Sequence, residues 1–227
     1  MNAGLSFWIV FLVLIAVMWY CDRKFNMLRD ASTATPKPYS YARVQLAWWT
    51  VLIFSAMISI LLLKGQLPTL DNSMLVILGI SAGTTTVARL IDQSDRQKSA
   101  GPLSQDSKGQ NFLLDLLSDN TGVNIHRLQT FILNLSYGLW FIHTVLHNLS
   151  NDPCAGSLVK DCASHSLDFI IPSISNNDLI LLGLSSGTYA ALKTTENKDV
   201  RGGAGGADQQ PEFVTDEGGT RSTQAAG

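Results

Sequence analysis

A chain of 227 residues suits one domain rather than two. Charged residues make up only 15% of it, and the apolar residues gather into long uncharged runs. The net charge of −2 is uninformative about nucleic acid, because the basic residues only follow one side of the membrane-spanning segments described next, and no nucleic-acid partner is expected. A soluble protein with buried helices is the alternative, but soluble chains rarely contain uncharged runs as long as residues 4–20 and 46–63.

We predict an all-α integral membrane protein with five transmembrane helices. A helix needs about 20 mainly apolar residues to cross the hydrocarbon core, and the first two runs meet that length unaided. The other three segments contain more Ser, Thr, Asn and Gly and lie at residues 74–88, 128–146 and 178–192. The first run could instead be a signal peptide, but no Lys or Arg precedes it and no small-residue cleavage site follows it.

Lysine and arginine indicate the orientation of these helices. The segments between successive predicted helices lie alternately on the two sides of the membrane. Those on one side contain most of the basic residues: Arg23, Lys24, Arg29, Lys37, Arg43, Arg89, Arg96, Lys98, Lys108, Arg127, Lys193, Lys198 and Arg201. The segments on the other side hold only Lys64 and Lys160. Basic residues are retained in the cytoplasm, so we expect the N-terminus outside and the C-terminus in the cytoplasm.

Two cysteines lie in the second predicted outer loop, residues 148–168. Cys154 and Cys162 are flanked there by Asp, Pro and Gly, and a disulfide can form and persist outside the cytoplasm. We expect them to be joined, with free thiols or metal ligands as the alternatives. Cys21 lies at the inner end of the first helix and is interpreted as a membrane-edge residue.

The sequence contains an internal repeat. Residues 78–84 read LGISAGT and residues 182–188 read LGLSSGT, an offset of 104 residues. Arg43-Val44-Gln45 matches Arg127-Leu128-Gln129 at an offset of 84 residues, and an insertion in the cysteine-bearing loop explains the difference. The core is therefore predicted as two tandem two-helix repeats of the same orientation, preceded by one extra helix.

With these motifs the chain resembles a family of uncharacterised bacterial inner-membrane proteins. The shared features are an Arg-x-Gln start of one helix and an LxGISxGT end of the next, present twice, and a linking stretch like residues 111–119 here. The resemblance covers about residues 39–193. It implies the fold and a bacterial inner-membrane location, but no activity. The chain departs from the pattern at Leu133-Asn134, where the first copy has Trp49-Thr50, and in the length of the cysteine-bearing loop.

Each LGxSxGT segment places two glycines four residues apart on one helix face, where they let another backbone approach closely. The hydroxyl groups beside them can bond across such a contact or line a water-filled pore. The candidate packing or pore-lining residues are Gly79, Ser81, Gly83, Thr84, Thr85, Gly183, Ser185, Gly187 and Thr188.

Polar residues also mark the inner ends of the second and fourth helices. Arg43, Gln45, Arg127 and Gln129 could form a cytoplasmic mouth. The arginines could instead reach lipid headgroups, or pair with Asp92 or Asp115. Asn134 is expected to bond to a neighbouring helix.

The segments between these helices complete the predicted organisation. Residues 111–119 have the spacing of a short amphipathic helix on the inner membrane face or capping the bundle. The predicted parts are an N-terminal helix (1–21), a cytoplasmic linker (22–42), the first repeat (43–92), a second linker with the amphipathic helix (93–122), the second repeat (123–193) and a disordered cytoplasmic tail (194–227).

No enzyme activity, cofactor or metal is expected. The sequence lacks a nucleophile–base set, a CxxC cluster and a nucleotide-binding glycine loop, and His143 and His147 alone are weak support for a metal. We predict a homo-oligomeric pore or ion channel, because the third and fifth helices are rich in hydroxyl groups. A membrane anchor or scaffold that docks a cytoplasmic protein is the alternative. A transporter is a third possibility, weakened because no acidic residue lies deep in a predicted helix.

Overall fold

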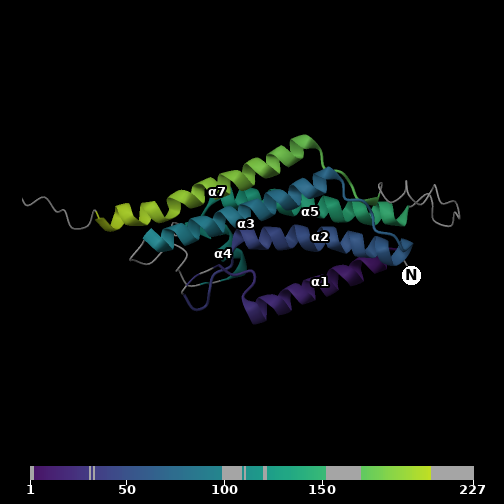
Figure 1. Ribbon diagram of the computed structural model, residues 1–227, viewed down its shortest axis with the longest axis horizontal. Helices are drawn as coiled ribbons and strands as arrows, with labels where there is room; N and C mark the ends of the chain where they lie inside the picture. Colours follow the sequence, from purple (N-terminus) through teal and green to yellow (C-terminus); the bar gives the residue numbers. More distant parts are fainter. Residues whose placement is uncertain are drawn as a thin grey trace, which may run out of the picture.

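The computed structural model describes residues 3–30, 32, 34–98, 109, 111–119, 122–151 and 170–205. The described chain is mostly helical, as predicted, and its long helices run along one axis (Figure 1). These are α1 (Ala3–Phe25), α2 (Tyr41–Lys64), α3 (Asn72–Lys98), α5 (Ile125–Ser150) and α7 (Asn176–Gly205). Between α3 and α5 lie the short helix α4 (Phe112–Leu117) and an antiparallel hairpin of β1 (Ser118–Asp119) and β2 (Gly122–Val123).

Three helices are long and apolar enough to cross a membrane: Gly4–Phe25, Tyr41–Lys64 and Asn72–Asp95. The helices α5 and α7 are not among them. The helix α5 contains histidines, an arginine and asparagines, and in α7 the apolar residues are concentrated in the first half of the helix. The apolar part of α7, residues 178–192, would rise about 22 Å, less than the roughly 30 Å of a hydrocarbon core. The count of five membrane-spanning helices therefore stays a prediction.

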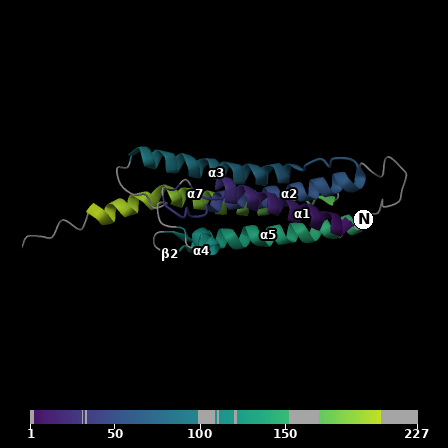
Figure 2. The ribbon, with the colours of Figure 1, turned by 90° about the horizontal axis from the view of Figure 1, so that it is seen from below.

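The helices form two antiparallel hairpins, α2–α3 and α5–α7, with α1 on one side. The helices α3 and α7 pack against each other and run in the same direction, and so do α2 and α5. Figure 2 shows α3 and α5 on opposite sides of α2. The helix α1 packs on α2 and α5. The two hairpins thus lie side by side in the same orientation.

The helix starts follow the offsets of the sequence repeat. The helix α2 begins at Tyr41 and α5 at Ile125, positions that correspond at the offset of 84 residues. The helices α3 and α7 begin at Asn72 and Asn176, which correspond at the offset of 104 residues. The hairpins therefore agree with the proposed duplication, although their descent from one unit stays a prediction.

An apolar core fills the space between the hairpins and the first half of α1. Its most deeply buried side chains include Phe7, Trp49, Leu52, Phe141 and Val145. The rings of Trp49 and Phe141 meet edge to face with their centroids 6.5 Å apart, a favoured arrangement of aromatic pairs. The interior at this level is filled by the side chains of this cluster.

One end of the bundle is covered by a structure that we call the cap, formed by the described part of residues 26–40, α4 and the β1–β2 hairpin. Leu116 of α4 is fully buried against Tyr41, Ala88 and Tyr189 of the long helices. The predicted amphipathic helix is thus present and caps the bundle. It ends at Leu117, earlier than predicted, because the chain turns into the hairpin, where Gly122 takes a positive φ of 115°.

Two predicted boundaries differ from the structure. The helix α3 continues to Lys98 and α7 to Gly205, so residues 93–98 are not linker and residues 194–205 are not disordered tail. The polar residues involved include Gln, Glu, Arg and Lys, which are good helix formers, and extending an existing helix avoids the cost of nucleation. Cys154, Cys162 and the rest of the tail lie outside the described residues.

Candidate functional site

The two hairpins meet at Asn134, which is buried on α5. Its Oδ1 accepts a hydrogen bond from the Trp49 indole at 2.8 Å, and its Nδ2 donates to the Tyr41 hydroxyl at 3.3 Å and to the Thr130 carbonyl at 2.8 Å. The expected bond to a neighbouring helix is confirmed. The first repeat has Thr50 at the position of Asn134. The side chain that differs between the repeats therefore forms the polar contact between α2 and α5.

Gly138 lies one turn further along α5 and packs against α2. Among the described glycines, it is the one where an added Cβ atom would come closest to another residue. A Cβ atom there would lie 2.5 Å from Nε1 of Trp48, which donates to the Asn134 carbonyl at 3.3 Å. Sequence analysis did not single out this residue. The available signal was the spacing of Asn134 and Gly138, which puts a polar and a small residue on one helix face.

The glycines that sequence analysis did single out lie elsewhere. A Cβ atom added at Gly79, Gly83 or Gly187 would meet nothing within 4 Å, and at Gly183 it would only touch Ile80 at 3.4 Å. Close packing of these glycines within the chain is therefore not observed. Gly79, Gly83 and Gly187 lie on the outside of the bundle, whereas Gly183 faces Ile80 of α3; contact of these glycines with another copy stays a prediction.

The hydroxyl groups of the two repeated segments are mostly buried inside the chain. Ser81 is 0% exposed, and Thr84, Thr85 and Ser185 are also buried, while Thr188 is half-buried. The Thr84 and Thr188 hydroxyls donate to carbonyls of their own helices, as Ser and Thr often do, and the Thr85 hydroxyl also reaches the Ala42 carbonyl at 3.0 Å. Among these hydroxyls, the one with a described hydrogen bond to another helix is that of Thr85, which joins α3 to α2.

A small polar junction lies where α2, α3 and α7 meet. Gln45 Nε2 donates to Ser186 Oγ at 3.0 Å, whereas Gln45 Oε1 and Ser81 Oγ are buried without a partner among the described residues. Thr85 contacts Ala42, and one turn along each antiparallel helix brings Ser81 and Gln45 to the same level. Buried polar atoms that lack a protein partner are usually satisfied by water. The matching Gln129 is exposed, so the two Arg-x-Gln motifs differ in role.

The two arginines of these motifs both bind the cap. Arg43 donates to the Arg29 carbonyl and, at 3.5 Å, to the Met27 carbonyl in the loop after α1. Arg127 donates to the Ser118 carbonyl at 2.8 Å and lies 5.5 Å from the centroid of the Tyr189 ring. Each arginine therefore fixes a cap backbone onto its own hairpin.

Two carboxylates, one on α4 and one on α1, bind the backbone of the loop after α1. Asp115 Oδ2 accepts from the Tyr39 amide at 3.2 Å, and Asp22 Oδ1 accepts from the Leu28 amide at 3.0 Å. The guanidinium of Arg29 lies 3.8 Å from the Asp22 carboxylate and 4.7 Å from the Tyr39 ring centroid. Asp115 thus binds the cap backbone, and the alternative of a pair between these arginines and Asp92 or Asp115 stays a prediction.

The opposite end of the bundle has its own polar contacts. Ser73 accepts a hydrogen bond from the Ile174 amide at 3.1 Å, which ties the start of α3 to the chain entering α7. The hydroxyl and amide of Ser73 donate to Asp71 and lower the pKa of that carboxyl. Asp178 accepts from the Tyr137 hydroxyl at 2.6 Å near the same end, so this acidic residue joins α5 to α7.

The remaining candidates carry little chemistry. His143 and His147 are exposed on α5 with ring centroids 6.4 Å apart, and no cluster of three or more metal-ligating side chains occurs among the described residues. Cys21 is half-buried and has a free thiol. No protein-family model, curated protein or solved structure matches the chain.

Proposed function

We propose that this protein is a membrane-embedded scaffold that presents the cap to a protein partner in the cytoplasm. The proposal rests above all on one observation: the corresponding arginines of both hairpins, Arg43 and Arg127, donate to backbone carbonyls of the cap. The cap is thereby held in one conformation before any partner arrives. Such preorganisation lowers the entropy cost of binding.

The cap also exposes apolar side chains that are suited to an interface. Val123 of β2 is 63% exposed, Leu113 of α4 is 54% exposed, and Ile125, which begins α5 directly after the cap, is 73% exposed. These three residues are called the cap residues below. Exposed apolar groups gathered at one end of a protein favour an interaction site. The excess of Lys and Arg in the segments at this end supports its orientation toward the cytoplasm.

A homo-oligomeric pore of the bacterial inner membrane is the second candidate. It is supported by the outward-facing glycines Gly79, Gly83 and Gly187, which leave room for the helices of another copy. It is weakened by the burial of Ser81, Thr84, Thr85 and Ser185, because a pore lined by these hydroxyls would need them to face water. We therefore favour the scaffold.

Photocrosslinking in cells tests the scaffold. A photoreactive residue at position 123 should give one discrete protein adduct, and Leu113→Asp should abolish it. The control is Leu67→Asp, in the loop before α3 at the opposite end of the bundle. Leu67 is 61% exposed, similar to Leu113 at 54%, and its substitution should leave the adduct unchanged. Adducts to lipid alone, or an adduct that both substitutions leave unchanged, would refute a protein site on the cap.

Ion flux in sealed liposomes tests the pore. Flux that is present for the parent, absent from empty liposomes and lost in Gly187→Leu would favour the channel over the scaffold. The glycine variant must remain helical, which circular dichroism measures. No flux across several salts at both voltage signs, together with an intact cap adduct, would leave the scaffold as the supported function.

A further inference from the structure

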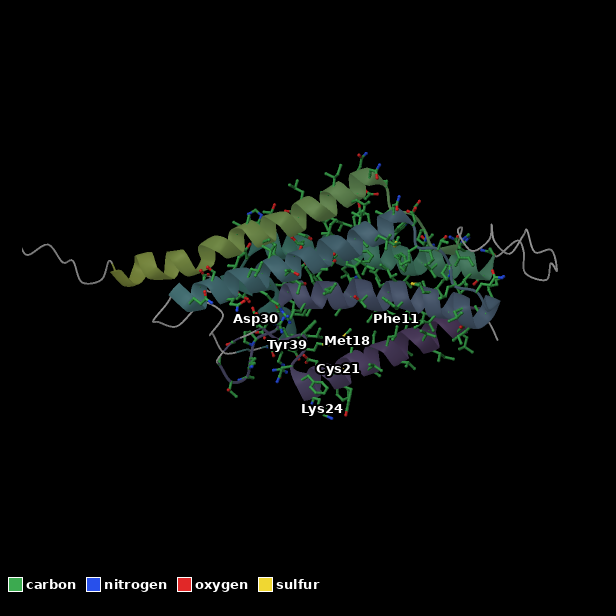
Figure 3. All side chains as sticks on the ribbon, viewed as in Figure 1. Phe11, Met18, Cys21, Lys24, Asp30 and Tyr39 are labelled. Atoms are coloured by element: carbon green, nitrogen blue, oxygen red, sulfur yellow. The ribbon has the colours of Figure 1, made fainter. Side chains whose placement is uncertain are left out.

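An apolar groove opens between α1, α2 and the cap. The first half of α1 is packed into the core through Phe7 and Phe11, but toward its C-terminal end α1 diverges from α2 (Figure 1). The resulting groove has a volume of about 310 Å³. Figure 3 shows Met18 of α1 in the space that faces α2, and Tyr39 beyond it in the cap.

The walls of the groove are almost entirely hydrocarbon. The helix α1 contributes Met18 and Trp19, α2 contributes Ala47 and Trp48, and the cap contributes Phe112. The one carboxylate in the lining, that of Asp22, is already bound by the Leu28 amide and lies beside Arg29. A groove of this composition accommodates an alkyl chain far better than a polar solute.

Two guanidinium groups stand over aromatic rings that line the groove. The guanidinium of Arg23 lies 4.9 Å from the ring centroid of Trp19, and that of Arg29 lies 4.7 Å from the ring centroid of Tyr39. Both distances are within the range of cation–π attraction, which holds the charges at the rim of the groove. The Arg29 guanidinium lies beside Asp22 and already donates to the Lys37 carbonyl and the Tyr39 hydroxyl, at 3.2 Å each, whereas Arg23 is exposed.

We propose that this groove binds one acyl chain of an anionic phospholipid, with its phosphate bound by Arg23 on the side of the groove where Arg29 also lies. The groove belongs to a helix that is apolar enough to cross a membrane, so lipid chains are the apolar molecules most abundant around it. The rim is positive and therefore complementary to a phosphate, and arginine binds phosphate through several donors. The lipid fills the space between the splayed end of α1 and the cap. This site is independent of any partner of the cap residues.

Native mass spectrometry of the detergent-purified chain tests the proposal. Phosphatidylglycerol and phosphatidylcholine with identical oleoyl chains are added separately. One phosphatidylglycerol should bind per chain, with an affinity about fivefold higher for each guanidinium that contacts the phosphate. Phosphatidylcholine should bind more weakly. Equal affinities for the two lipids would overturn the headgroup assignment.

Two pairs of variants separate the headgroup from the chain. Arg23→Gln should weaken phosphatidylglycerol binding about fivefold and leave phosphatidylcholine unchanged, whereas Lys64→Gln removes the same charge at the far end of α2 and should change neither. Ala47→Phe fills the groove and should abolish binding of both lipids. Ala82→Phe introduces the same ring at an exposed position of α3 and should bind like the parent.

Three results would contradict the site. The first is an Ala47→Phe variant that remains helical and still binds phosphatidylglycerol like the parent. The second is displacement of the lipid by glycerol 1-phosphate, which has the anionic group but no chain. The third is a protein dimer, observed in place of the lipid adduct, that dissociates in the Ala47→Phe variant. Such a dimer would assign the groove to a second copy of the chain.

Discussion

Replacing Gly138 with alanine tests whether α2 and α5 are held together by the approach of the Trp48 indole. The new Cβ atom would lie 2.5–2.7 Å from three atoms of that ring, far inside van der Waals contact. The ring is rigid, so the helices must separate or Trp48 must leave its position. Inserting one methyl group into a packed interface costs about 1–3 kcal/mol.

Helix propensity partly offsets this cost. Alanine is favoured over glycine inside a helix by about 1 kcal/mol, so the net loss in free energy of unfolding should be about 0–2 kcal/mol. For a chain of this size that corresponds to a decrease in Tm of at most roughly 8 °C. Tryptophan fluorescence during heating in detergent measures it, and the Trp48 indole should move at the same time.

The control is Gly83→Ala, where the added Cβ would meet nothing within 4 Å. This variant gains the same helix propensity without the clash, so its Tm should equal or exceed that of the parent. A double variant, Gly138→Ala with Trp48→Leu, should lose less stability than the sum of its single changes, because the clash is absent. If Gly138→Ala is as stable as Gly83→Ala, the close approach of α2 and α5 is refuted.

Three further predictions concern polar groups. Asn134→Ala should lower the free energy of unfolding by about 1–3 kcal/mol, because it leaves the buried Trp49 indole without its acceptor; an unchanged Tm in detergent would contradict this. Arg127→Gln should release the β1–β2 hairpin, seen as faster hydrogen exchange in β1 and β2 with unchanged exchange at the core of α2. The bonds from Ser73 lower the folded-state pKa of Asp71, so they contribute stability at neutral pH that is lost as the pH falls below about 4. Asp71→Asn should remove that part of the acid dependence of Tm, and an unchanged pH profile would disprove it.

The sequence was most informative about elements that a single run of residues determines. The uncharged runs at residues 4–20 and 46–63 predict helices because no loop tolerates so much apolar surface, and α1 and α2 contain them. The Arg-x-Gln motifs predict the starts of α2 and α5, whereas the LGxSxGT segments lie in the first halves of α3 and α7 and not at their ends. The ends of α3 and α7 were predicted less well, because polar helix formers look like linker in a membrane protein.

The site was predicted less completely, because its contacts depend on how helices face one another. Asn134 was expected to bond to another helix, since an amide inside an apolar segment needs a partner. The partner, Trp49, could not be predicted without the crossing of α2 and α5. The same holds for Gly138, and for Gly79 and Gly83, whose spacing does not reveal whether a neighbour is present.

The unequal faces of α2 and α5 have a consequence for which hairpins can pair. Trp48 and Trp49 form a protrusion, and the face of Asn134 and Gly138 is the notch that receives it. Two first hairpins paired in this way would oppose indole to indole, and two second hairpins would leave the notch unfilled. The contact therefore favours a first hairpin paired with a second hairpin over two hairpins of the same kind.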